Sequence, residues 1–383
     1  MNRFFQTRAM HYVTACCIVC VLSTQCARKP VQVDTRLQQA MLLVSESWYA
    51  LDTVVNEVWP GWDCYRNEIY FTAVPRVQDI MINPPEKPGR AYRLLGTAVQ
   101  GKPVYTRTPG EMDKVWGGAH RFNINKKRYK AVQFHPPSRE YSRRVLSVWK
   151  KQLGYTDLPS YAVDLACSAE MYMRIIFHEA FHRLQEKMNK AKAVNASHRS
   201  AFSSGPLLLM EGRILADAFT CTDTSRLIEL SRQFLAVRQK RRGSLFEDDI
   251  HWERRNEYIE GSAEYVETKA YLALSRQGYT AHVLSSGKHG YSGFSHKDEL
   301  TALLKMFIEK SPGYSADESQ AVLRCYFFGM AQGFILDRLC GHAWKKNFFD
   351  DGVYFETLLA QYSGYSTEMA QYYVEKAKEY ARL

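Results

Sequence analysis

The first part of the chain with a regular pattern has the period of an α-helix. From Thr35 to about Val58, apolar residues recur every three or four positions, and Pro60 and Gly61 follow directly. This spacing places the apolar side chains on one face of a helix, and the Pro–Gly pair stops it. We therefore predict a helix over 35–58.

The pattern changes between residues 66 and 135. Pro and Gly separate four short segments that are rich in β-branched and aromatic residues, namely EIYFTAV, RAYRLLGTAV, KPVYTRT and YKAVQFH. Such segments are typical of strands, so we expect a small sheet here.

After Pro137 the helical period returns and continues to the end of the chain. Helices are expected near 139–153, 168–190, 206–219, 223–241, 249–275, 298–310, 318–340 and 366–381. The predicted class is α+β and predominantly α, with a mixed region over 27–137 and a helical region over 138–383 that pack as one unit. In the last long helix, Gly329 and Gly333 form a GxxxG spacing, which we interpret as close helix packing in a core.

Composition agrees with a folded chain but identifies no partner. The 383 residues are 46% hydrophobic and 24% charged, which indicates a globular protein rather than a disordered one. The net charge is +11, yet the 51 Lys and Arg are interspersed with 40 Asp and Glu. Only RQKRRGS at 238–244 concentrates positive charge, and we interpret it as a solvated helix end before a glycine. We expect no nucleic-acid partner.

Residues 1–26 have the order of an export signal. Arg3 and Arg8 come first without any acidic residue, an apolar run extends from about Tyr12 to Leu22, and small and polar residues follow. Cys26 stands where bacterial lipoprotein signals place the acylated cysteine, although Gln25 precedes it in place of the usual small residue. We expect an exported protein in the periplasm or outer cell envelope, with possible membrane attachment through a lipid on Cys26. A soluble secreted protein and a cytosolic one are the alternatives.

The stretch IIFHEAFHRLQ at 175–185 carries the candidate chemistry. His178 and His182 are four residues apart, so on a helix both imidazoles can reach one point, and Glu179 projects beside them. Two neutral imidazoles and one further protein ligand suit Zn²⁺ with one position open. Zinc lowers the pKa of a water molecule to about 7, and a neighbouring carboxylate can then accept the proton. We assign His178 and His182 as metal ligands and Glu179 as the catalytic base.

A third ligand is needed, and two downstream glutamates are candidates. Glu211 lies in LLLMEGRILADAF and Glu260 lies in EYIEGSAEYVE, each on a predicted helix and each followed by a glycine. A glycine at that position lets a helix approach another backbone closely. Spacing alone leaves both candidates open.

HEAFH followed by a helix bearing EGSAEY resembles the gluzincin class of zinc metallopeptidases, in which a glutamate on a later helix completes the site. In that class an acidic residue four positions after this glutamate often hydrogen-bonds a ligating histidine. Glu264 stands four positions after Glu260, whereas Leu215 follows Glu211 at that spacing. The resemblance therefore implies Glu260 as ligand and Glu264 as the residue that orients a histidine, with Glu211 as the alternative ligand.

The order of HEAFHRLQ, LLLMEGRILADAF, EYIEGSAEYVE and FFGMAQGFILDRLCGHAW is also similar to a group of bacterial proteins described as metallopeptidases. It covers about residues 48–345, with a longer gap before Glu260 than in better-known gluzincins. Such enzymes commonly bind the oxyanion through a tyrosine or histidine, for which Tyr258, Tyr265 and His251 are weak candidates because the chain has 24 tyrosines.

Two functions from different classes follow. The first is a zinc-dependent peptidase that acts on a peptide or protein substrate. The second is a non-catalytic envelope lipoprotein that binds metal or a partner on a zincin-like fold. A general base beside an open metal position favours the first.

Overall fold

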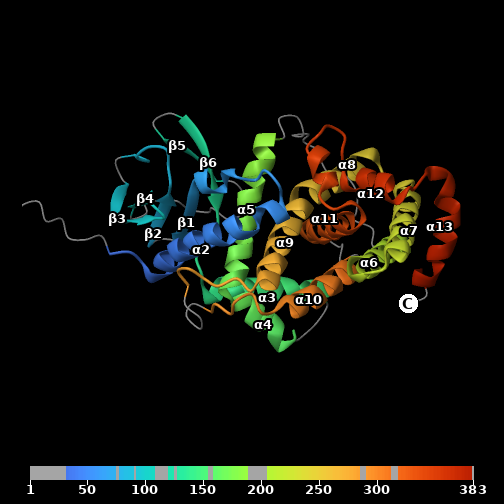
Figure 1. Cartoon of the computed structure of the whole chain (residues 1–383), viewed down its shortest axis with the longest axis horizontal. Coiled ribbons are helices and arrows are strands. Elements are labelled where there is room, and N and C mark those ends of the chain that lie inside the picture. The colour runs from blue at the N-terminus through green and yellow to red at the C-terminus, as the bar shows by residue number, and fades with distance from the viewer. Residues whose placement is uncertain are drawn as a thin grey trace, which may run out of the picture. The chain divides into compact units, whose positions relative to one another are not determined.

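The computed structural model describes residues 32–74, 77–89, 92–107, 120–124, 127–153, 158–188, 205–284, 290–311 and 318–381. Residues 35–383 form one compact unit, so the sheet and the helices after it belong together. The fold is α+β and mostly α, as the sequence predicts (Figure 1). The expected signal and Cys26 lie outside the described residues.

The described strands form one six-stranded sheet with the order β3-β4-β2-β1-β6-β5. The strands are β1 (Tyr70–Val74), β2 (Gln78–Ile82), β3 (Arg93–Val99), β4 (Lys102–Arg107), β5 (His120–Ile124) and β6 (Lys127–Gln133). Only β1 and β6 pair in parallel, and the other neighbours are antiparallel. In this register Phe71 of β1 lies opposite Met81 of β2, and both are buried in the core on one face of the sheet.

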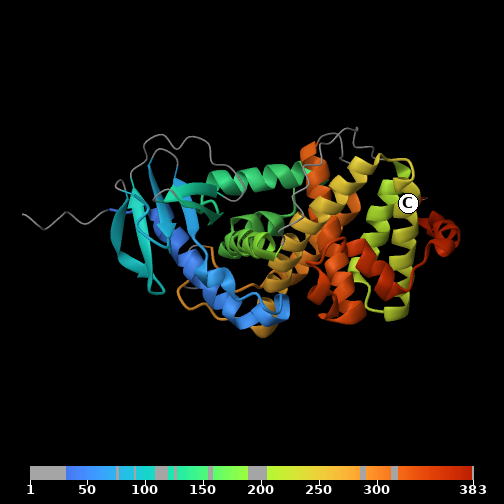
Figure 2. The ribbon, with the colours of Figure 1, turned by 90° about the horizontal axis from the view of Figure 1, so that it is seen from above.

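Helix α2 (Thr35–Val58) matches the predicted range and packs along β1 and two later helices. One of these is α5 (Ala169–Met188), which also contacts β6 and lies between the sheet and the helical part of the unit (Figures 1 and 2). Its face toward the protein interior carries Ile176, Phe177 and Phe181, all fully buried. This apolar face fixes α5 in place, so its polar residues are held at defined positions.

The helical part follows the predicted ranges closely. It contains α3 (Arg139–Leu153), α4 (Ser160–Cys167), α6 (Pro206–Thr220), α7 (Thr224–Arg242), α10 (Lys297–Lys310), α11 (Glu318–Cys340), α12 (Phe355–Ser363) and α13 (Ala370–Lys376). The sequence pattern does not predict α4, α12, β2 or β5. These elements are short, and a period is difficult to recognise over five to nine residues.

The segment predicted as one helix over 249–275 is one continuous helical run with an irregular turn inside it. It consists of α8 (Glu247–Asn256), a π-helical turn η2 (Glu257–Gly261) and α9 (Ser262–Gln277). A π turn is wider than an α turn and often occurs at functional sites.

Two glycines allow the π turn to contact α11 directly. A Cβ atom on Gly261 would lie 2.5 Å from the Cα atom of Gly329, and one on Gly329 would lie 2.4 Å from the carbonyl oxygen of Glu257. A side chain at Gly333 would meet the ring of Tyr265 at 2.7 Å. The GxxxG spacing therefore serves close packing between helices in the core, as the sequence predicts. None of the described helices is long and apolar enough to cross a membrane.

The basic run at 238–244 does end a helix, but the prediction that it is solvated was wrong. Arg238, Arg241 and Arg242 are all buried. They pair with carboxylates from four other elements, which are Glu211 of α6, Glu253 of α8, Glu257 of η2 and Glu356 of α12. The arginine charges are therefore compensated inside the protein. A local sequence pattern does not reveal this, because the partner carboxylates come from other elements.

Candidate metal centre

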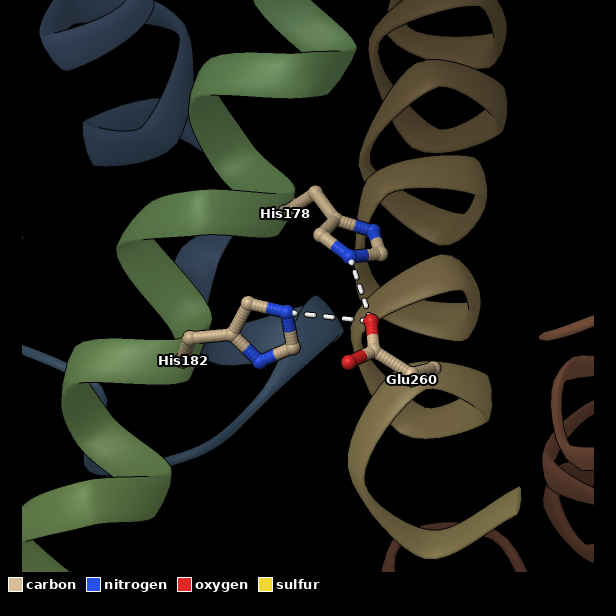
Figure 3. Close-up of side chains that lie close together, drawn as sticks. All are labelled: His178, His182 and Glu260. Carbon is tan, nitrogen blue, oxygen red and sulfur yellow. Dashed lines mark hydrogen bonds and ion pairs between the residues drawn. The ribbon is translucent and has the colours of Figure 1, made fainter. Parts of the chain in front are cut away.

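The two histidines of HEAFH face the π turn that carries Glu260 (Figure 3). Nε2 of His178 lies 3.4 Å from Oε2 of Glu260, and Nε2 of His182 lies 3.3 Å from the same oxygen. One ligand atom from each of the three residues lies within 4.8 Å of the others. Ligands at about 2.0–2.1 Å from a tetrahedral ion are themselves about 3.3–3.4 Å apart, so the spacing suits zinc.

The second nitrogen of each histidine is held by a different acceptor. Nδ1 of His178 lies 3.3 Å from Oε2 of Glu267, and Nδ1 of His182 lies 2.6 Å from Oε1 of Gln185. Gln185 is itself fixed, because its Nε2 donates to the carbonyl oxygen of Ile259 at 2.8 Å and to Ser262 at 2.7 Å. A hydrogen bond at Nδ1 leaves Nε2 as the free acceptor, so both rings present the nitrogen that can bind a metal.

The structure places Glu267, and not Glu264, against the ring of His178. Glu264 is close by, but it accepts a hydrogen bond from Arg174 at 3.1 Å. Arg174 pairs with Glu267 as well, and Glu267 is the carboxyl group that also reaches Nδ1 of His178. Glu267 follows Glu260 by seven residues in EGSAEYVE, and this spacing alone does not distinguish it from Glu264.

Glu264 and Glu267 differ in their own charge at neutral pH. Burial and the neighbouring Glu267 raise the pKa of Glu264 to about 8, so it carries a proton at neutral pH. Burial also acts on Glu267, but Arg174 holds the pKa of this carboxyl below its usual value. Glu267 is thus the anion that accepts a hydrogen bond from the Nδ1–H group of His178. His178, Glu264 and Glu267 could also be considered as a metal site, but Arg174 already supplies a positive charge there.

Without a metal, the centre is held by ion pairs. Burial lowers the pKa of His178, but hydrogen bonds to Glu260 and Glu267 outweigh it and raise this pKa well above the usual value. Burial raises the pKa of Glu260, but the two histidines outweigh this effect and hold the pKa well below its usual range. Two imidazoles around one carboxylate are a donor set that zinc accepts.

Glu179 is half-buried beside the two histidines. Burial raises the pKa of its carboxyl, and the charges of His182 and His178 lower it only in part. A carboxylate with a raised pKa is a better proton acceptor near neutral pH than a solvated one. The position and the pKa direction both suit a general base.

Glu211, the alternative third ligand, lies outside this centre. Its side chain is fully buried and accepts hydrogen bonds from Nε of Arg238 at 3.1 Å and from Arg241. Both of its oxygens are therefore engaged in the arginine cluster. The structure brings Glu260, and not Glu211, to the histidines.

Tyr326 of α11 is a member of the centre that the sequence pattern does not predict. Its ring stacks on His178 with centroids 5.5 Å apart, and burial together with the charge of Glu260 raises its pKa well above the usual value. No local motif marks it, because it reaches the site through the packing of α11 on η2 and α9.

The three weak oxyanion candidates lie elsewhere. The hydroxyl of Tyr265 donates to Asp337 at 2.6 Å, the ring of Tyr258 stacks on Phe348, and His251 is exposed and pairs with Glu247. Each of them has a packing or surface role.

Comparison with known proteins finds no matching family model, no matching curated protein and no matching solved structure. The functional interpretation therefore depends on the geometry of the centre itself.

Proposed function

We propose that this protein is a zinc-dependent peptidase in which His178, His182 and Glu260 bind the metal. The observation that carries the proposal is the orientation of the two imidazoles, since both Nδ1 atoms are occupied by acceptors and both Nε2 atoms converge on one oxygen of Glu260. A purely structural cluster would not require two separately oriented rings. The likeness of HEAFH and EGSAEY to gluzincins agrees with this assignment.

Glu179 is assigned as the general base. A bound zinc ion would polarise the carbonyl of the substrate and lower the pKa of a water molecule. Glu179 would accept a proton from the attacking water and later donate it to the leaving amine, which its raised pKa favours.

Tyr326 is assigned as a hydrogen-bond donor to the developing negative charge. Its hydroxyl keeps its proton at neutral pH because its pKa is raised, and its ring is held against His178. We include export to the cell envelope and attachment through Cys26 in the proposal, for which the N-terminal pattern is the support.

The test is metal content, measured by mass spectrometry on the purified chain and on four variants. We expect near-stoichiometric zinc in the wild type, its loss in His178→Ala and Glu260→Ala, and its retention in Glu211→Gln and Glu179→Gln. Glu179→Gln should also abolish cleavage of peptides. A folded wild type that takes up no zinc at neutral pH would refute the proposal, and zinc binding without any hydrolysis would favour the non-catalytic alternative.

A further inference from the structure

A pocket of about 660 Å³ opens beside α5, on the sheet side of the helix. It is formed by residues before β1, after β2, at the start of β4 and in β6, together with Arg183 of α5. This volume lies within the range of pockets that bind small molecules or a few residues of a peptide. No group described above uses it.

The pocket lies next to the proposed catalytic base along one helix face. Arg183 follows Glu179 by four residues, so both side chains project from the same side of α5, about 6 Å apart along the helix axis. Arg183 lines the pocket, and Glu179 borders the metal centre. An extended peptide advances about 3.3 Å per residue, so a substrate bound at Glu179 would reach the pocket two or three residues away.

The lining of the pocket is positively charged. Four of its ten lining residues are cationic, and Glu68 is its one carboxylate. Glu68 is already neutralised, because it accepts hydrogen bonds from Nε of Arg183 at 3.2 Å and from Lys187. Lys130 is likewise paired with Glu186.

The two other cations have no such partner within the described part of the chain. Neither Arg128 nor Lys102 forms an ion pair there, and Lys102 Nζ donates a hydrogen bond to Oδ1 of Asn67 at 3.5 Å. Arg128 is exposed and Lys102 half-buried, so both side chains can meet a ligand. The nearby Glu86, which accepts from the hydroxyl of Tyr129 at 3.4 Å, is not among the lining residues.

We propose that this pocket binds a carboxylate of the substrate through Arg128 and Lys102, which gives the enzyme a preference for acidic peptides. The inference rests on the proposed peptidase function. A guanidinium binds a carboxylate through two parallel hydrogen bonds, and a lysine adds a compact charge. The carboxylate can belong to an acidic side chain or to the free C-terminus of the peptide.

The experiment uses internally quenched peptides with one backbone sequence. Each peptide carries a single Glu or Gln, and this residue is moved to each position of the peptide in turn. Every peptide is made in two forms, with a free C-terminal carboxylate and with a C-terminal amide. We expect the wild type to cleave the preferred acidic peptide with a kcat/KM about tenfold or more above that of its neutral partner. The Glu/Gln pairs report a side-chain carboxylate, and the acid/amide pairs report the C-terminus.

The ratio should fall to about one in the double variant Arg128→Gln and Lys102→Gln. Lys127→Gln is the matched control, because it removes the same charge from the neighbouring position of β6, is exposed and does not line the pocket. In this control the ratio should remain. Thermal unfolding of each variant excludes misfolding as the cause.

A second readout separates this inference from the peptidase proposal. Fluorescence anisotropy of the same peptides with the Glu179→Gln chain measures binding without cleavage. Preferential binding of acidic peptides that the double variant loses, with no hydrolysis by the wild type, would support the pocket and refute the peptidase. Hydrolysis without a charge preference, or with one that the double variant keeps, would refute the pocket and leave the peptidase standing.

Discussion

The contact between Gly261 and α11 gives the most direct test of how the third ligand is positioned. In Gly261→Ala the new methyl carbon would lie 2.5 Å from Cα of Gly329 and 2.9 Å from the carbonyl oxygen of Cys325. Carbon atoms pack best at about 3.5–4.0 Å, so the two backbones would have to separate by about 1 Å. Both neighbours are backbone atoms, which cannot rotate away.

The expected cost follows from two opposing effects. Overpacking costs about 1–3 kcal/mol, and the backbone contacts place this case near the upper end. Alanine recovers up to about 1 kcal/mol over glycine in a helix, so the free energy of unfolding should fall by about 2 kcal/mol. Glu260 precedes Gly261 and would move with it, so zinc affinity should fall by about tenfold to a hundredfold.

Urea denaturation of the metal-free protein measures the fall in the free energy of unfolding, and competition with a chromogenic chelator measures the fall in zinc affinity. Gly96→Ala is the control, because Gly96 is exposed in β3 and a Cβ atom there meets nothing within 4 Å. This control should stay within about 0.5 kcal/mol of the wild type. A Gly261→Ala protein as stable as the wild type, with equal zinc affinity, would refute the close contact and its role in placing Glu260.

Three further predictions concern the surroundings of the centre. Glu211→Gln leaves Arg238 without a charged partner in α6, so unfolding in urea should show a loss of about 3–5 kcal/mol with zinc content retained; loss of zinc would contradict the separation of the two clusters. Gln185→Leu removes the acceptor for Nδ1 of His182 and should weaken zinc binding about tenfold to a hundredfold in the chelator assay, and unchanged affinity would exclude this orienting role. Burial opposes ionisation of Glu356, but three arginines lower its pKa to about 2, compared with an ordinary value of 4.5. Its stabilising effect of about 3 kcal/mol is therefore complete above pH 4.5 and is lost as the pH falls toward 2. Denaturation at a series of pH values should show the stability difference between wild type and Glu356→Gln shrinking over this interval. A constant difference would refute the assignment.

Much of the fold could be predicted because its long helices carry a clear apolar period. The ranges expected for α2 and α3 agree with the structure, and α7 differs by one residue at each end. His178, Glu179 and His182 could also be assigned, since their chemistry depends on spacing within one helix. The assignment of Glu260 as the third ligand depended on the resemblance to gluzincins. Glu260 lies 78 residues after His182, and only the tertiary contact of η2 with α5 brings the two together.

The incorrect or missing assignments share a physical cause. Glu267, and not Glu264, meets His178 through the packing of α9 on α5, and Tyr326 enters from α11 through packing alone. The arginines near 240 were interpreted as solvated because their carboxylate partners come from separate helices. Each depends on contacts between distant segments, which a local sequence pattern does not contain.

The π turn at Glu257–Gly261 joins two halves of one helical run that face different partners. Glu253 and Glu257 meet the buried arginines, whereas Glu260 and Glu267 meet the histidines of α5. A π turn holds one more residue than an α turn, so the helical run stays continuous through it. Glu257 and Glu260 both lie in this turn and face the arginines and the histidines respectively. The buried arginines and the candidate metal centre therefore share one short piece of backbone, and a change that displaces the turn should disturb both.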